Sequence, residues 1–196
     1  MLTFAAALPV LALSAEDQKA YEDWYRARFG TYPVQTPDQG QGDTGSGNGS
    51  APGGGTRPGT LQPATPTAFE QGVLDLLNQE RARNGLAPVK MDPYLVQVAR
   101  IKGQDMVKNG YYGHHSPTYG YSSSLLSTFG IQYRQSRENL TVAGTPAIAH
   151  ESWMSSQSHR ENMLKPYWTH VGIGVTPRGG SSSYHGYYVV EIFVQR

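Results

Sequence analysis

Residues 67–110 read TAFEQGVLDLLNQERARNGLAPVKMDPYLVQVARIKGQDMVKNG, and the glycines Gly85 and Gly110 end two segments with helical periodicity. The first segment begins with Thr67 and Glu70, which have the spacing of a capping box. In this motif each side chain accepts a hydrogen bond from the backbone N–H of the other residue. The second segment begins with an Asp-Pro dipeptide, a helix cap followed by the residue best suited to the first helical position. The stretch therefore predicts two successive amphipathic helices.

The chain that follows changes from helices to a hairpin. A third helix is expected over Thr145–Met154, and a short helix near Ser124–Phe129 interrupts the Tyr-, Ser- and Gly-rich stretch before it. Near the end, Val171–Val175 alternates branched residues with glycine, and Tyr187–Val194 is dense in strand-forming residues. Helices followed by a hairpin, without βαβ alternation, predict an α+β fold.

Three segments of different composition precede the helical region. Residues 1–15 are apolar and shorter than a bilayer span, which predicts a secretory signal peptide, with a buried N-terminal segment as the alternative. Residues 16–30 mix charged and aromatic side chains at helical spacing and predict a short amphipathic helix. Residues 31–60 are rich in Gly, Pro and Ser and predict a flexible linker. The compact domain is therefore expected over residues 61–196, with no membrane span in the mature protein.

The overall composition excludes several functional classes. The chain has 196 residues, no Cys, and 16 Lys+Arg against 15 Asp+Glu. Without a thiol there is no disulfide, no cysteine zinc site, no iron–sulfur cluster and no cysteine nucleophile. A net charge of +1 without long runs of one sign gives no reason to expect nucleic acid as a partner.

Candidate site residues lie in three separate segments after the second helix. These are His114, the Arg-Glu-Asn sequence at 137–139, and residues 153–164, which read WMSSQSHRENML. Two histidines and a carboxylate from distant segments could hold a divalent ion with open positions for water. They could equally form a hydrogen-bonded cleft, and spacing alone does not decide between these possibilities.

The order of these segments resembles the CAP superfamily of cysteine-rich secretory proteins, antigen 5 and pathogenesis-related 1 proteins, and most of all its cysteine-free bacterial secreted branch. The resemblance extends from about Phe69 to Phe193, and besides the segments above it includes GYYGHHSP, VGIGV and YYVVEIF. It implies an α–β–α sandwich in which helices cover both faces of a small antiparallel sheet. This agrees with the α+β prediction made from the residues.

The resemblance also implies site residues. The family has a central cleft lined by two histidines and two acidic residues, and the cleft binds divalent cations in some members. By position, His114 and His159 match the two histidines, and Glu138 matches the Glu of the family's Gly-Glu-Asn motif. Arg137 stands where the family has that Gly, and Ser156 stands in the second acidic position. Three of the four cleft groups are therefore present.

The resulting hypothesis is a secreted protein of the extracellular space or cell envelope. Its cleft is expected to bind a divalent cation such as Zn²⁺, or a small, lipidic or cell-wall ligand, and the domain is expected to be non-enzymatic or weakly enzymatic. No organic cofactor is expected, and the protein is expected to be a monomer. The alternative is an extracellular hydrolase of peptides or cell-wall polymers with His159 or Glu138 as general base. A third possibility is a purely structural adhesion module. The residues expected to support the cleft are Asn139, Ser156, Arg160 and Asn162.

Overall fold

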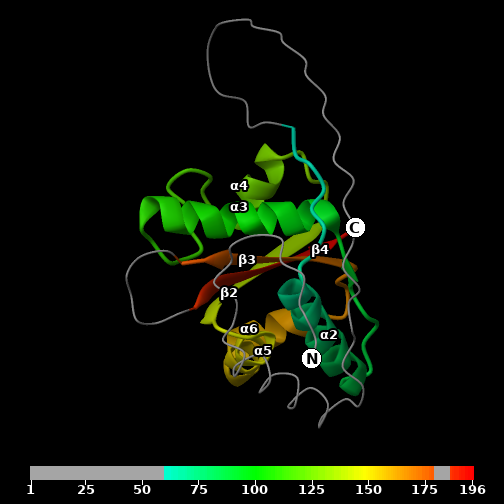
Figure 1. The fold of residues 1–196 in the computed structure, drawn as a ribbon. Coiled ribbons are helices and arrows are strands. Elements are labelled where there is room, and N and C mark those ends of the chain that lie inside the picture. Colours follow the sequence, from blue (N-terminus) through cyan, green and yellow to red (C-terminus); the bar gives the residue numbers. More distant parts are fainter. Residues whose placement is uncertain (1–59, 179–185) are drawn as a thin grey trace, which may run out of the picture.

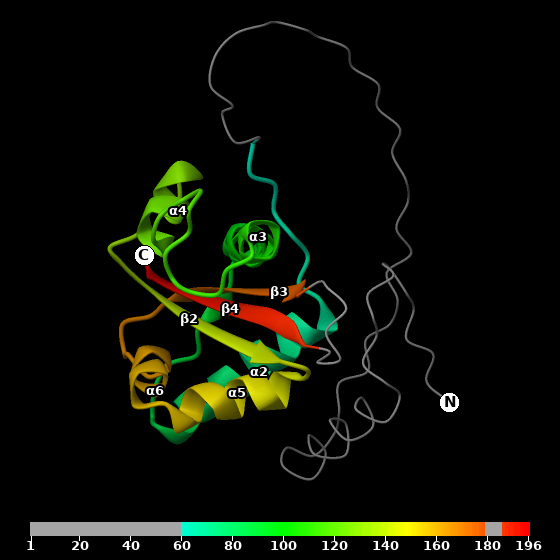
Figure 2. The ribbon, with the colours of Figure 1, turned by 90° about the vertical axis from the view of Figure 1, so that its left-hand side faces the viewer.

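The computed structural model describes residues 60–178 and 186–196, which form a sandwich of three layers (Figure 1). The middle layer is a four-stranded sheet, in the order β1 (Lys90–Met91), β3 (His170–Pro177), β4 (Tyr187–Gln195) and β2 (Gln135–Ala143). One face is covered by α3 (Pro93–Asn109) and α4 (Ser122–Thr128). The opposite face is covered by α2 (Ala68–Arg83), α5 (Pro146–Ser155) and α6 (Gln157–Met163), as Figure 2 shows. The α–β–α sandwich expected from the sequence is confirmed.

Several expected segments lie outside the described residues. These are the signal peptide at 1–15, the amphipathic helix at 16–30 and, except for its last residue, the linker at 31–60. Among the helices that the structure describes, none is both long and apolar enough to cross a membrane.

The local signals at the helix starts act as expected. At α2, Thr67 accepts a hydrogen bond from the backbone N–H of Glu70, and the Glu70 carboxylate accepts one from the backbone N–H of Thr67. At α3, the side chain of Asp92 accepts from two backbone N–H groups of the first turn. Gly110 ends α3 in the left-handed conformation, with φ of 65°. Each of these interactions joins residues close in sequence, which is why the sequence alone predicts them.

The sheet contains two strands that the sequence did not predict. Strand β2 pairs antiparallel with β4 along its whole length, from Gln135 opposite Gln195 to Ala143 opposite Tyr187. Strand β1 pairs with β3 in parallel, so a two-residue parallel edge joins an otherwise antiparallel sheet. The predicted hairpin of β3 and β4 is confirmed, and it forms the centre of the sheet.

The glycines of β3 allow α3 to lie directly on the sheet. A Cβ atom at Gly172 would lie 2.2 Å from the carbonyl carbon of Leu95, and one at Gly174 would lie 2.4 Å from that of Ala99. Real Cβ atoms do not approach backbone atoms this closely. The alternation in VGIGV therefore serves strand formation and also removes the side chains that would hold α3 away from β3.

The sheet separates two apolar cores. The core on the α3 side includes Leu95, Leu126 and Ile192, and the core on the other side includes Trp153 and Phe193. Trp153 is fully buried in the second of these cores. Successive residues of a strand point to opposite faces of a sheet, so each strand contributes alternately to both cores.

Candidate functional site

The candidate site is built on β2, at the edge of the sheet. Glu138 pairs with Ile192 of β4, and because Ile192 belongs to the core on the α3 side, the Glu138 side chain faces that side. His114 lies in the loop after α3, and its Nδ1 is 2.8 Å from Oε1 of Glu138. The Glu138 side chain is only 3% exposed, whereas that of His114 is 52% exposed. A buried carboxylate therefore anchors a histidine at the surface.

The second histidine reaches the site from the opposite layer. His159 lies on α6, which covers the other face of the sheet (Figure 2). Burial lowers the pKa of His159 below its ordinary value, and the nearby charge of His114 lowers it further. Both effects favour the neutral form of the His159 ring.

Asn139, the residue after Glu138, joins α6 to the sheet. Its amide N–H groups donate to the backbone carbonyl of His159 at 3.2 Å and to Oε2 of Glu191 at 3.3 Å. Its carbonyl oxygen accepts from the amide of Asn162 at 3.0 Å. Neighbouring strand residues face opposite sides of the sheet. Glu138 therefore contacts His114 on the α3 side, and Asn139 contacts α6 on the other side.

Arg160 and Ser156 lie at the junction of α5 and α6. Arg160 donates a hydrogen bond to the carbonyl of Met154 at 2.7 Å, which braces this junction. The Ser156 hydroxyl is 3.3 Å from that of Ser158. Among the described residues, Ser156 makes no hydrogen bond with either candidate histidine or with Glu138, so the structure gives it no direct contact with the site.

An ion bound at this site would have the two histidines, and not three side chains, as its candidate protein ligands. Within residues 60–178 and 186–196, no group of three or more His, Asp or Glu side chains is gathered as a metal site. Nδ1 of His114 must donate to Glu138, because a carboxylate only accepts hydrogen bonds. The lone pair of His114 is then on Nε2, available together with the His159 ring. Glu138 would act on an ion through His114, as an outer carboxylate.

Two buried charged residues near the site were not predicted as site residues. Glu191 is fully buried on β4, and burial raises its pKa from 4.5 to about 8, opposed by the hydrogen bond from Asn139. Lys102 is 1% exposed on α3; burial lowers its pKa, and the charges of Glu138 and Asp105 oppose this. The only sequence signal for either residue is a charged side chain within an apolar run.

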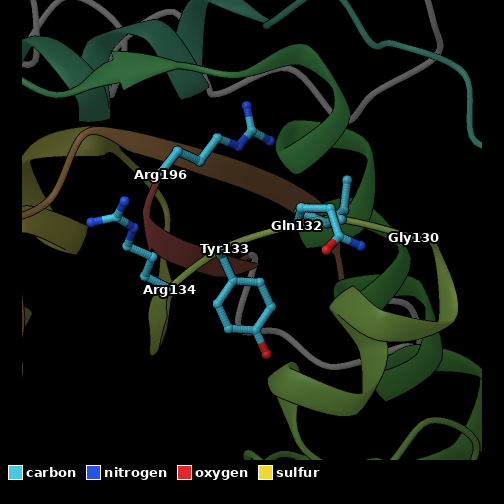
Figure 3. Close-up of a pocket in the computed structure, with 6 residues that line it drawn as sticks. Gly130, Gln132, Tyr133, Arg134 and Arg196 are labelled. Atoms are coloured by element: carbon cyan, nitrogen blue, oxygen red, sulfur yellow. The ribbon is translucent and has the colours of Figure 1, made fainter.

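A separate hollow lies between the start of β2 and the end of the chain (Figure 3). Its volume is about 520 Å³, and Arg134 and Arg196 are among its lining residues. One Arg196 nitrogen donates to Asp92 at 2.5 Å, and the two arginine side chains point in different directions (Figure 3). The hollow is lined by none of the three candidate site residues. The full lining is Gly130, Ile131, Gln132, Tyr133, Arg134 and Arg196.

Fold and site together define an α–β–α sandwich domain in which a buried carboxylate of the edge strand β2 contacts a histidine of the loop after α3, with a second histidine on α6. The model of the CAP family, described as the Cysteine-rich secretory protein family, matches residues 74–194, and the chain belongs to this family. This confirms the resemblance seen in the sequence.

Curated relatives and solved structures agree with this assignment. The chain is 40% identical over 121 residues to the uncharacterized protein YkwD of Bacillus subtilis, covering 61% of this chain and 47% of YkwD. It is 35% identical over 112 residues to the uncharacterized membrane protein YlbC of the same species, covering 56% of this chain and 32% of YlbC. The chain thus spans half or less of these relatives. A solved extracellular protein containing a SCP domain, from Bacillus anthracis, superimposes with a TM-score of 0.57 at 27% identity, over 65% of this chain and 40% of that one.

Proposed function

We propose that this CAP domain binds a divalent cation such as Zn²⁺ through the imidazoles of His114 and His159. The observation that carries the proposal is the 2.8 Å contact between Nδ1 of His114 and Oε1 of the buried Glu138. Histidines that bind metals commonly donate their other ring N–H to a carboxylate, which fixes the ring and raises the basicity of the ligating nitrogen. Glu138 holds His114 in this arrangement, with Nε2 left for an ion.

The state of His159 also supports the proposal. A metal binds the neutral imidazole, and the lowered pKa of His159 favours this neutral form. Two histidines leave the other coordination positions of the ion to water or to a ligand. A bound Zn²⁺ would act there as a Lewis acid on an oxygen atom of that ligand. A small, lipidic or cell-wall molecule with an exposed oxygen is the ligand class proposed.

The proposed place of action is outside the cell. The support is the Bacillus anthracis relative, which is described as extracellular, together with the signal peptide predicted at residues 1–15. The hydrolase alternative stays a prediction. Among the described residues, no serine or threonine hydroxyl is hydrogen-bonded to His114 or His159, so this part of the chain does not supply a nucleophile activated by imidazole.

Calorimetric titration of the full chain with Zn²⁺ at pH 7.5 tests the proposal. The wild-type protein should bind one ion, and His114→Gln and His159→Gln should each weaken binding by at least about tenfold, because each removes one of two protein ligands. The control is His115→Gln, since His115 is exposed beside His114 but packs its ring on Tyr121, at 5.1 Å between centroids. Equal heats for the wild type and both site variants would refute the metal site.

A further inference from the structure

The loop that carries His114 is held from below by a buried lysine. Lys102 lies on α3 and is 1% exposed, so its ammonium group is removed from water. Its Nζ atom donates to the backbone carbonyls of Gly113 at 2.7 Å and of His114 at 2.9 Å. The third donor reaches the hydroxyl of Tyr111 at 3.1 Å. All three ammonium protons therefore have acceptors, and two of these acceptors belong to the backbone at His114.

One turn further along α3, Asp105 holds the same loop through its carboxylate. Asp105 accepts hydrogen bonds from the hydroxyls of Tyr111 and Ser116, each at 2.6 Å, and of Thr118 at 2.5 Å. Residues three apart in a helix lie on one face, so Lys102 and Asp105 present opposite charges to the loop side by side. The loop is thus fixed at its beginning, at His114 and beyond it.

An isolated buried ammonium group is strongly unfavourable, and hydrogen bonds and opposite charges nearby offset that penalty. Here Glu138 and Asp105 both act electrostatically on Lys102. Glu138 also accepts the hydrogen bond from His114. The lysine is therefore connected to the site in two ways, by its bonds to the His114 backbone and by its charge near the carboxylate that orients the His114 ring.

We propose that Lys102 is a positioning residue for His114: its ammonium group fixes the Gly113–His114 backbone so that Nδ1 of the ring meets Glu138. The consequence for metal binding rests on the proposed function, whereas the positioning of the ring does not. Lys102 touches neither an ion nor a ligand in this arrangement. It acts through the backbone of the histidine that does.

Removal of this lysine would change Zn²⁺ affinity in opposite directions, depending on whether its charge or its backbone contacts matter more. A positive charge near the site repels a cation, so loss of the charge alone would tighten Zn²⁺ binding. Loss of the backbone contacts would release His114 from Glu138 and weaken binding, by the tenfold or more typical of groups that orient metal ligands. The sign of the change in affinity therefore separates the two effects.

The first experiment is Zn²⁺ titration of the full chain carrying Lys102→Met, compared with Lys108→Met. Lys108 is an exposed lysine of the same helix, so this control removes the same charge without touching the loop. We expect binding about tenfold weaker for Lys102→Met and unchanged for Lys108→Met. Unchanged or tighter binding by a folded Lys102→Met protein would overturn the proposal.

The second experiment needs no metal, and it separates failure of this inference from failure of the metal site. In metal-free wild-type protein, the Nδ1 proton of His114 should give a resolved NMR signal, because the hydrogen bond to Glu138 slows its exchange with water. Lys102→Met should lose this signal and Lys108→Met should keep it. A signal of wild-type intensity in Lys102→Met would overturn the inference even if no zinc binds.

A milder variant covers the case in which Lys102→Met does not fold. Tyr111→Phe leaves the lysine in place and removes one of its three acceptors, together with one donor to Asp105. Exchange of the His114 Nδ1 proton should then be a few times faster than in the wild type. An unchanged exchange rate in Tyr111→Phe would contradict the proposal that Lys102 positions His114.

Discussion

Replacing Glu191 with Gln should change how the stability of the domain depends on pH. Glu191 is fully buried in the centre of the sheet, and among the described residues its Oε1 has no hydrogen-bond partner. Burial raises its pKa from 4.5 to about 8. The folded state therefore keeps this proton up to about pH 8, whereas the unfolded chain releases it near pH 4.5.

The sign and size of the effect follow from proton linkage. Between these two pKa values the folded state binds more protons than the unfolded state, so the free energy of unfolding falls as pH rises. Each pKa unit is worth 1.36 kcal/mol, and the displacement from 4.5 to about 8 corresponds to a loss of about 5 kcal/mol. This is as large as the whole stability of many domains. Glutamine has nearly the same shape, stays neutral, and its carbonyl oxygen can accept the hydrogen bond from Asn139.

The assay is urea unfolding, followed by tryptophan fluorescence from pH 5 to pH 9. We expect Glu191→Gln to match the wild type near pH 5 and to exceed it by about 5 kcal/mol at pH 9. The control is Glu151→Gln, which changes an exposed carboxylate on α5. Because the wild type and Glu191→Gln have the same histidines, the difference between them removes the histidine contribution to the pH dependence of the unfolding free energy. If the wild type and Glu191→Gln lose stability equally with rising pH, Glu191 does not hold a proton in the folded state, and the reasoning is wrong.

Two further predictions concern packing and the proposed ion. Gly174→Ala should destabilise the domain by about 1–3 kcal/mol in urea unfolding, because the new Cβ would lie 2.4 Å from the α3 backbone at Ala99. The control is Gly113→Ala, because no atom lies within 4 Å of a Cβ at that position. Equal urea midpoints for the two variants would contradict the close packing of α3 on β3. Zn²⁺ affinity should fall as the pH drops, because the imidazoles become protonated. His159 should stay neutral to a lower pH than a free histidine, because its pKa is lowered. Calorimetry from pH 5 to pH 8 measures this, and an affinity independent of pH would exclude histidine ligands.

The features that the sequence predicted correctly depend on interactions between residues close together along the chain. The capping pair of Thr67 and Glu70, and the cap at Asp92, each work within one helical turn. The site candidates His114, Glu138 and His159 came from the family resemblance, which preserves the order of motifs.

Strand β2 shows why other features were missed. Its first residues, Gln135 to Arg137, are polar and give no strand pattern, and the strand is defined by its pairing with β4, which lies about fifty residues further along the chain. Lys102 fitted the apolar stripe of its helix by position, and nothing local shows that its ammonium group meets a loop carbonyl. Glu191 likewise lies within an apolar strand sequence, and nothing local shows that its carboxyl group is buried.

The sequence by itself determined α2, α3, α4, α5 and the central hairpin, because caps, turns and periodicity depend on neighbours within a few residues, and the order of its motifs indicated the family; α6, which carries His159, was not predicted. The tertiary structure decided the site. His114 and Glu138 are 24 residues apart and meet only because the register of β2 against β4 turns Glu138 to the α3 side and Asn139 to the α6 side. A slip of one residue would exchange these faces and separate the pair. Sheet register depends on packing of the whole domain, and for that reason no local pattern in the chain shows that His114 and Glu138 meet.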